Sequence, residues 1–416
     1  MRALSNSAPS APAAPAARGD ADVADSNSGA LPTDLAEALG VERIPPTASI
    51  ASLDADSLAS VQASLVIEHH LGYLPADWEN LAVSDLIQLQ HDRTRRPLIG
   101  TDIALKALAI LLVVAHHAGI IAFAGGAMLL LFLAGHAAAR YHAGDLFAGE
   151  RGPVMASLSY RIILPYLAVV GIFLIYHQTA HLPSLTMTAN LFGPYPTGAP
   201  VLAPFWFLEV YVQLMLVLIT VLAVPALRRR AAAYPWEAGV ALLVTSIILA
   251  VVTLFTGLSD TTDRVPYLLA YVFAFGWCLH FADTPNKRFA LTVLALVALP
   301  LLSGPTAGAG WVLFGAFALT AWEPRFSVPR WLKPRLLTIS AASIYIYLVH
   351  SLPVHLVTSE WPLTAPLLSG VLAIVLSVMT GVALHTAGRL APALWRRLKK
   401  KTAGGSAYHG SSSVSQ

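Results

Sequence analysis

Two ionisable side chains in one long apolar run could carry out acid–base chemistry inside a membrane. Lys106 and His117 lie eleven residues apart in LKALAILLVVAHH. On a helix they return to nearly the same face, about 16 Å apart along its axis. A lysine in hydrocarbon is costly, so Lys106 is a functional candidate, although its side chain could extend to the interface. His117 has the ordinary pKa of a general base, but could instead be a packed histidine.

Other polar side chains are expected at the same two depths. Glu209 near the start of one apolar run and His350 near the end of another should lie level with His117, and Arg161 level with Lys106. This arrangement predicts a polar shaft. Glu209 could equally form a structural pair, and His350 is more often structural than catalytic. The single cysteine, Cys278, excludes an internal disulfide, and a lone buried thiol is usually inert.

A serine ahead of the apolar runs could carry a modification. Leu58, Val61 and Leu65 recur at helical spacing and predict a helix that begins near Ser57. A hydroxyl at a helix N-terminus can hold an attached phosphate against backbone N–H groups and the positive end of the dipole. The plainer interpretation is that Ser57 caps the helix. A second short helix is predicted in NLAVSDLIQLQ, with Val83, Leu86 and Leu89 inward.

The composition places most of the chain in a bilayer. Of 416 residues, 56% are hydrophobic and only 12% are charged, against roughly a quarter charged in a soluble domain. The net charge of +3 is no nucleic-acid signal, because basic residues follow the apolar runs instead of forming one face. No metal site is expected, since the histidines lack ligand spacing. The fold class expected is all-α.

Ten apolar runs predict about ten transmembrane helices. They cover residues 102–122, 123–139, 160–178, 205–227, 236–256, 264–281, 289–303, 307–322, 336–356 and 364–388. Lys and Arg gather on the N-terminal side of the predicted membrane, and Arg264 alone lies on the other side. By the positive-inside rule both termini are cytoplasmic, as in a multi-pass protein of a bacterial inner membrane.

Composition also divides the chain. We expect a disordered Ala/Pro/Ser-rich tail at 1–30, a small helical bundle at 31–90, a basic linker at 91–100, a transmembrane domain at 101–390 and a basic, disordered tail at 391–416.

The small region resembles an acyl carrier protein. The matching residues are Leu53, Asp56-Ser57-Leu58, Val61, Leu65, Ile67-Glu68, Gly72, Leu74-Pro75, Val83 and Asp85-Leu86. The resemblance implies 4'-phosphopantetheine attached to Ser57, with a phosphopantetheinyl transferase and an acyl-loading enzyme as partners. His69 and His70 stand where carriers are usually acidic. Acidic faces recruit separate enzymes, so a tethered carrier would need fewer such charges.

Residues 100–390 resemble the acyltransferase-3 family of integral-membrane acyltransferases. The matching segments are Lys106 with His117, LLLFLAGHAAARY with Gly135, PFWFLEVYVQ, and SIYIYLVHSLP with Tyr347 and His350. The resemblance implies catalysis by His117 with Glu209, and a pantetheine phosphate held near Lys106 or Arg161. The sequence departs from the family pattern at two ionisable positions. Tyr211 occupies the family's frequent glutamate position, and its paired arginines reduce to Arg161.

Together these features predict a membrane acyltransferase. It would move an acyl group from a phosphopantetheine thioester, on its own carrier domain or on coenzyme A, to a hydroxyl or amine of a sugar, lipid or secondary metabolite. Membrane lipids are expected partners and nucleic acid is not. The alternative is a transporter or exporter whose carrier domain delivers thioester-bound cargo. A third possibility is a vestigial carrier beside an enzyme that uses acyl-CoA.

Overall fold

The computed structural model is almost entirely helical, as the composition predicts. It describes residues 31–53, 57–71, 73–75, 77–91, 98–122, 125–176, 178, 180–192, 200–257, 264–303, 307–323, 326–360 and 365–406. The tail predicted at 1–30 lies outside these ranges, as do residues 407–416 of the second predicted tail. The prediction of disorder is wrong for residues 391–406, which continue the helix Pro366–Ser406. The chain divides into a small unit, Met1–Arg95, and a large unit, Arg96–Gln416.

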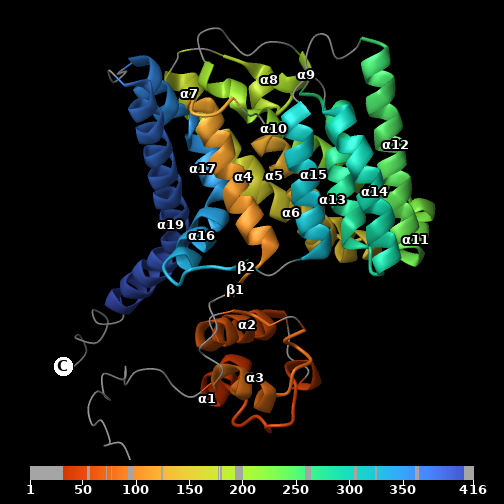
Figure 1. Ribbon diagram of the computed structural model, residues 1–416. Helices are drawn as coiled ribbons and strands as arrows, with labels where there is room; N and C mark the ends of the chain where they lie inside the picture. Colours follow the sequence, from red (N-terminus) through yellow and green to blue (C-terminus); the bar gives the residue numbers. More distant parts are fainter. Residues whose placement is uncertain are drawn as a thin grey trace, which may run out of the picture. The chain divides into compact units, whose positions relative to one another are not determined.

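The small unit is built from short helices around one apolar core (Figure 1). Its elements are α1 (Leu31–Leu39), η1 (Ile50–Leu53), α2 (Ser57–Leu71) and α3 (Val83–His91). Ser57 is the first residue of α2, and its side chain lies outside the described atoms. Val83 and Leu86 are buried as predicted, and Leu89 is partly buried.

The predicted inward face of α2 is wrong at Leu65, which is 61% exposed. The buried positions are instead Ala63, Ile67 and His70, at steps of four and three that also fit one helical face. Apolar residues occur all around α2, so spacing alone does not select the face that packs on α1. The other two positions of the predicted face, Leu58 and Val61, lie outside the described side chains.

His70 explains one departure from the carrier pattern. Its Nε2 lies 2.6 Å from Asp34 Oδ2 of α1, and Gln90 Nε2 of α3 lies 3.4 Å from its Nδ1. The His70 side chain is 3% exposed. It therefore ties three helices together inside the small unit, and only its neighbour His69 is on the surface.

The large unit is a bundle of helices. Its first half begins at one strand of a two-stranded sheet, here called the clasp, and ends in short helices and a turn. Its elements are β1 (Leu98–Ile99), α4 (Thr101–His117), α5 (Gly126–Ala148), α6 (Arg151–Leu158), the π-helical turn η2 (Ser159–Ile163), α7 (Leu164–Tyr176), α8 (Leu182–Leu185), α9 (Ala189–Phe192) and η3 (Pro200–Phe205). Within this unit α8 and α9 lie at one end, here called the far end (Figure 1). The clasp lies at the other, near end.

The second half returns to the clasp before its last helices. Its elements are α10 (Trp206–Val221), α11 (Pro225–Ala233), α12 (Pro235–Phe255), α13 (Pro266–His280), α14 (Pro285–Leu302), α15 (Ala307–Trp322), β2 (Phe326–Ser327), α16 (Leu332–Ala341), α17 (Ser343–Val349), α18 (Ser351–His355), the π-helical turn η4 (Leu356–Glu360) and α19 (Pro366–Ser406). Strand β2 pairs antiparallel with β1, Leu98 opposite Ser327 and Ile99 opposite Phe326.

Several helices are long and apolar enough to cross a bilayer, as a membrane protein requires. Among the described residues five qualify: Arg151–Tyr176, Leu202–Val221, Pro235–Phe255, Pro285–Leu302 and Pro366–Gly388. A sixth is the pair Leu332–Ala341 and Ser343–Glu360, which is bent by 62°. The remaining apolar runs form helices too, in part shorter ones. The number ten therefore stays a prediction.

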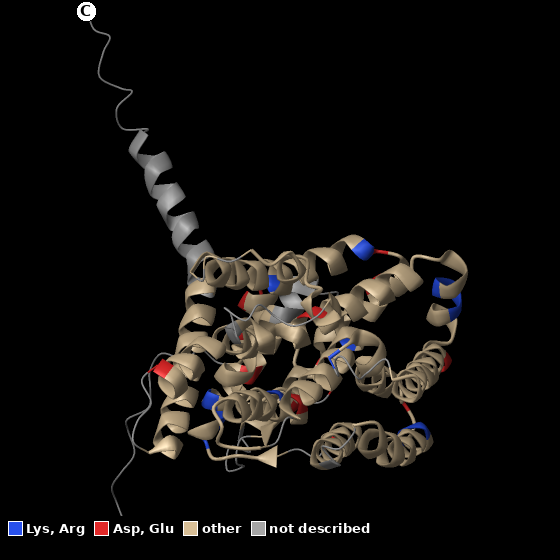
Figure 2. Cartoon of the chain, turned by 90° about the horizontal axis from the view of Figure 1, so that it is seen from above, with Lys and Arg blue, Asp and Glu red and all other residues tan. Residues whose placement is uncertain are grey.

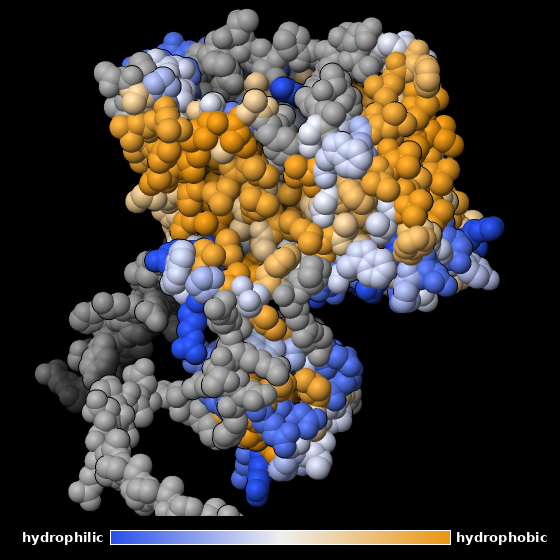
Figure 3. All heavy atoms as spheres, in the orientation of Figure 1, coloured by the Kyte–Doolittle hydropathy of each residue, from blue (hydrophilic) through white to orange (hydrophobic). Residues whose placement is uncertain are grey.

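The surface of the large unit matches this interpretation. On the face shown in Figure 3 an apolar belt covers most of the middle of the unit, and hydrophilic residues collect toward the near end. Seen from above, the ribbon is mostly uncharged, with a cluster of basic residues on one short helix at the edge (Figure 2). That helix is α11, which contains Arg228, Arg229 and Arg230.

Two glycines let α5 and α13 cross at backbone contact. A Cβ on Gly135 would collide with the carbonyl oxygen of Phe273, and one on Gly276 with that of Phe132. Small residues at a helix crossing permit this approach in membrane proteins. The glycine of the LFLAG segment thus has a packing role, and the crossing sets the spacing between the helices that hold His136 and His280.

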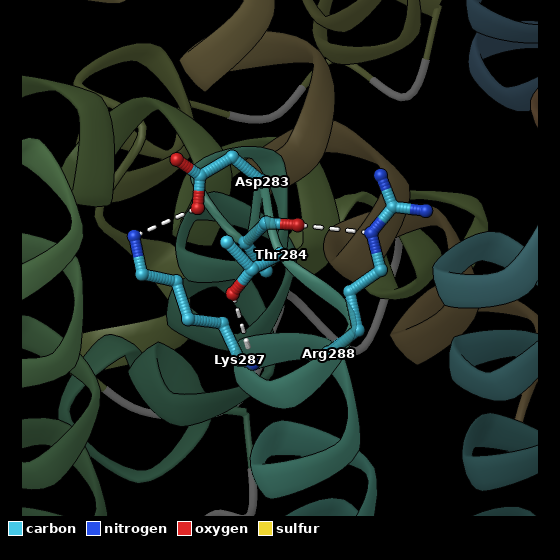
Figure 4. A network of polar contacts seen from close by, with 5 residues as sticks. Asp283, Thr284, Lys287 and Arg288 are labelled. Carbon is cyan, nitrogen blue, oxygen red and sulfur yellow. Dashed lines mark hydrogen bonds and ion pairs between the residues drawn. The ribbon is translucent and has the colours of Figure 1, made fainter.

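The turn into α14 is fixed by a local network (Figure 4). Thr284 caps the helix by accepting from the Lys287 backbone N–H at 3.4 Å, and Lys287 Nζ lies 2.7 Å from Asp283 Oδ1. The hydrogen bond from Lys287 lowers the pKa of Asp283. Arg288 donates to the carbonyl oxygens of Ala282 at 2.9 Å and Ala321 at 3.3 Å. It thereby joins the near ends of α13 and α15.

Candidate functional site

The centre of the candidate site is a pair of histidines from opposite ends of the sequence. His117 Nδ1 lies 2.8 Å from His350 Nε2. The two rings are 5.0 Å apart at their centroids, with 24° between their planes. His117 is the last residue of α4, and His350 lies at the joint between α17 and α18. The structure therefore joins two residues predicted only to share a depth.

The hydrogen bonds of His350 define which nitrogens carry protons in the neutral pair. His350 Nδ1 lies 2.6 Å from the carbonyl oxygen of Tyr347. A carbonyl oxygen only accepts, so Nδ1 must hold the proton and Nε2 must present a lone pair. His117 Nδ1–H then donates to that lone pair. In consequence His117 Nε2 is unprotonated and can act as a base.

His350 is held rigidly while His117 is more accessible. His350 is fully buried, and its carbonyl oxygen accepts from Ser377 Oγ of α19 at 3.4 Å. The Tyr347 ring packs against that of His350, with centroids 5.5 Å apart. Tyr347 also donates its hydroxyl proton to the carbonyl oxygen of Pro204 in η3. The bond from Tyr347 connects the histidine pair to the segment that leads into α10.

Glu209, in the first turn of α10, accepts hydrogen bonds from residues of α7 and α9. It is fully buried. Its Oε1 accepts from the Tyr166 hydroxyl at 2.6 Å, and its Oε2 accepts from the Asn190 backbone N–H at 2.8 Å. Asn190 in turn exchanges side-chain hydrogen bonds with Gln213, at 2.8 and 3.1 Å. These bonds position α7, α9 and α10, and Glu209 also interacts electrostatically with Tyr347, which packs on His350.

Arg264 adds a positive charge at the far end. Its guanidinium lies over the ring of Trp206, 5.9 Å from the centroid, as in a cation–π contact. Its carbonyl oxygen accepts from Asn190 Nδ2 at 3.1 Å. The arginine interacts electrostatically with both His117 and Tyr347. An anionic or strongly polar group near His117 would meet this charge.

Lys106 and Arg161 are not brought together by the described contacts. Lys106 is partly buried on α4, three turns from His117, and interacts electrostatically with Asp102 one turn earlier. Arg161 is exposed on η2 and interacts electrostatically with His142 of α5. π-helical turns are rare and often mark functional positions. Lys106 shares a helix with His117, whereas Arg161 lies on the outside of the bundle.

Sequence reasoning missed several partners. Tyr166 and Asn190 were not expected beside Glu209, and no spacing rule could find them, because they come from other helices. The rings of His136 and His280 meet at 5.6 Å, and His136 Nδ1 has no side-chain partner among the described residues. Within the same residues no group of three or more His, Cys, Asp or Glu side chains is arranged to hold a metal ion.

Comparison with known proteins adds no relative. No family model, no curated protein and no solved structure matches this chain.

Proposed function

We propose that the chain is a membrane acyltransferase that takes its acyl group from a phosphopantetheine thioester. The observation that carries the proposal is the oriented pair His117–His350, in which Nε2 of His117 is left as a base. The resemblance of this pair's segments to the acyltransferase-3 family supports it. General-base help of this kind is worth roughly 10²–10⁴-fold in rate.

The proposed reaction uses only His117, the acceptor and the thioester. His117 Nε2 takes the proton of an acceptor hydroxyl or amine as the acceptor atom attacks the thioester carbonyl carbon. The C–S bond then breaks, and the departing thiolate takes the proton back from Nε2. The products are an ester or amide and a free thiol. His350 is a positioning residue, because it accepts from His117 Nδ1 throughout and does not touch the reacting atoms.

Ser57 is the proposed attachment point of the arm. It opens α2, where backbone N–H groups and the helix dipole favour a phosphate. Lys106 is the proposed contact of the arm's phosphate within the large unit. A phosphopantetheinyl transferase would install the arm and a separate enzyme would load it. Coenzyme A carries the same arm, so acyl-CoA is the alternative donor.

A transporter is the second candidate, and one observation favours it. The helices α16 and α17–η4 form a bent pair with a 62° break. Broken helices at a polar site are typical of secondary transporters. In that case the buried histidines would bind cargo and not transfer an acyl group.

The deciding experiment measures the intact mass of the native protein and its acyl-transfer activity. Protein purified from its native cell should carry an added phosphopantetheine mass, absent in Ser57→Ala and present in the control Ser60→Ala. In proteoliposomes with an acylated carrier, His117→Ala should lose acyl transfer at least 100-fold, whereas His116→Ala should retain it. A folded His117→Ala protein with undiminished transfer would refute the enzyme. Unmodified native protein would refute the internal donor and leave acyl-CoA.

A further inference from the structure

A groove on the side of the large unit has no role in the site described above. It encloses about 600 Å³, within the range of ~300–1,000 Å³ typical of small-molecule sites. Its walls come from α7, from the stretch Val349–Val357, and from α19. Apart from Thr380 every lining residue is apolar. The lining residues include Ile172, Val349, Leu352, Leu372, Leu376 and Leu384.

The groove opens sideways into the apolar surroundings. Ile172 is 64% exposed and Leu352 is 38% exposed, although both line it. The surface over α19 belongs to the apolar belt (Figures 1 and 3). An alkyl chain in the bilayer can enter such a groove without crossing water. A polar or charged ligand would find almost no partner there.

The groove shares a wall with the histidine pair. Val349 and Leu352 line it, and between them in sequence stands His350, whose ring contacts His117 of α4. The segment α17–α18 therefore separates the two. Along α19 the lining runs from Leu372 to Leu384, about 18 Å. Ser377, which donates to the His350 carbonyl oxygen, lies within that stretch. The groove thus extends past the level of the candidate base.

A buried hydroxyl in the same wall lacks a partner. Ser351 is 5% exposed, and its Oγ has no hydrogen bond among the described residues. Buried polar groups are almost always paired, so an orphan one calls for a ligand or a water. Ser351 follows His350 directly and precedes the groove residue Leu352.

We propose that this groove holds the alkyl chain of the acyl acceptor, a membrane lipid with a hydroxyl or amine on its head group. The inference rests on the proposed acyl transfer. The donor thioester arrives on an arm from a soluble carrier, whereas the groove is open to the bilayer. An acceptor anchored in the membrane fits the groove better than the donor does. The chain would lie along α19, and the head group would pass around the segment α17–α18, which separates the groove from the histidine pair, to reach His117 Nε2.

The test narrows the groove and compares two acceptors. Leu376→Trp fills the groove from α19, and Leu368→Trp is the control, since Leu368 is an exposed α19 residue outside it. In proteoliposomes the acceptors are phosphatidylglycerol and soluble glycerol. We expect Leu376→Trp to raise KM for phosphatidylglycerol at least tenfold, without changing kcat/KM for glycerol. Leu368→Trp should change neither. Equal losses on both acceptors, or none, would overturn the proposal.

Lipid labelling distinguishes failure of the proposed lipid groove from failure of the proposed acyl transfer. Phosphatidylglycerol with a photoactivatable group in its chain should label groove residues of the wild type, and Leu376→Trp should remove that labelling. Labelling spread evenly over the apolar belt would show ordinary boundary lipid and overturn the groove. If the wild type transfers to neither acceptor yet labels the groove, acyl transfer to these acceptors fails while the lipid site stands.

Discussion

At the residue scale, the two ring nitrogens of His350 have different partners, and this difference orients His117. Nδ1 donates to a carbonyl oxygen and Nε2 accepts from His117. Partners of this kind fix the tautomer of a functional histidine in many sites. The site therefore depends on a residue that need not touch the substrate.

The first prediction tests that positioning role. His350→Leu should lower kcat about 10–100-fold, the size typical when an orienting partner is lost, with KM little changed. His350→Gln should retain more activity, because its amide oxygen can still accept from His117 Nδ1. Transfer assays over a pH series check this, since loss of the orienting bond should also displace the pH profile. Equal activity of both variants would contradict the role.

Glu209 supports a second prediction at this scale. Glu209→Leu leaves the Asn190 N–H without its acceptor, whereas the Tyr166 hydroxyl keeps the Ser184 carbonyl oxygen at 3.0 Å. The orphaned N–H should cost about 1–3 kcal/mol of stability. Glu209→Gln should fold nearly normally, because one amide oxygen still serves Asn190. Thermal melting in detergent provides the measurement. If Glu209→Gln melts normally yet abolishes transfer, the carboxylate has a chemical role.

Residue spacing in the sequence predicted the helix and the depth of some site residues, but not their partners. The periodicity of a single helix placed Lys106 and His117 on one segment, and apolar run boundaries placed His350 at a similar depth. The hydrogen bond between His117 and His350 joins residues 233 positions apart. The Tyr166–Glu209 bond likewise joins separate helices. Such pairings depend on the bundle's packing, which one sequence does not specify.

At the element scale, the crossing of α5 and α13 depends on glycine. Gly135→Ala places a methyl group against the Phe273 carbonyl oxygen and must push the helices apart. Overpacking of this kind costs about 1–3 kcal/mol. Gly144→Ala on the same helix meets nothing within 4 Å and should be neutral or stabilising by about 0.5–1 kcal/mol. Comparable melting temperatures for the two variants would argue against the crossing.

The small unit has its own cross-link between elements. Asp34→Ala removes the acceptor of the buried His70 ring and should destabilise the unit by about 1–3 kcal/mol. Glu37→Ala, on the exposed side of α1, should have little effect. Hydrogen exchange of α1–α3 in the full chain measures both. Unchanged protection in Asp34→Ala would show that the pair contributes no net stability.

At the scale of the whole molecule, the basic residues predict an orientation. In a Cys278→Ala background, Arg229→Cys on α11 and Leu182→Cys on α8 place exposed thiols at the near and far ends. An impermeant reagent should label Leu182→Cys from outside intact cells, and Arg229→Cys only in inverted vesicles. Labelling of both from the same side would refute the orientation given by the positive-inside rule.

The helical class of the fold followed directly from composition, because so apolar a chain must satisfy its backbone internally. The helix count did not follow. A run such as 336–356 looks continuous in sequence, yet the structure bends it by 62° between Ala341 and Ser343. Nothing in the local residue pattern marks that bend, and its position one helix before His350 is set by tertiary packing.

The clasp between β1 and β2 has a consequence for the order of synthesis. Leu98 leaves the ribosome about 230 residues before its partner Ser327, or roughly 10–50 s at ~5–20 residues per second. Until then the small unit is complete in sequence while the clasp that anchors the start of α4 is still unpaired. If Ser57 carries the proposed arm, a modifying enzyme would therefore meet it on a nascent chain in which the His117–His350 pair has not yet formed, so that the arm can be attached before the proposed site exists.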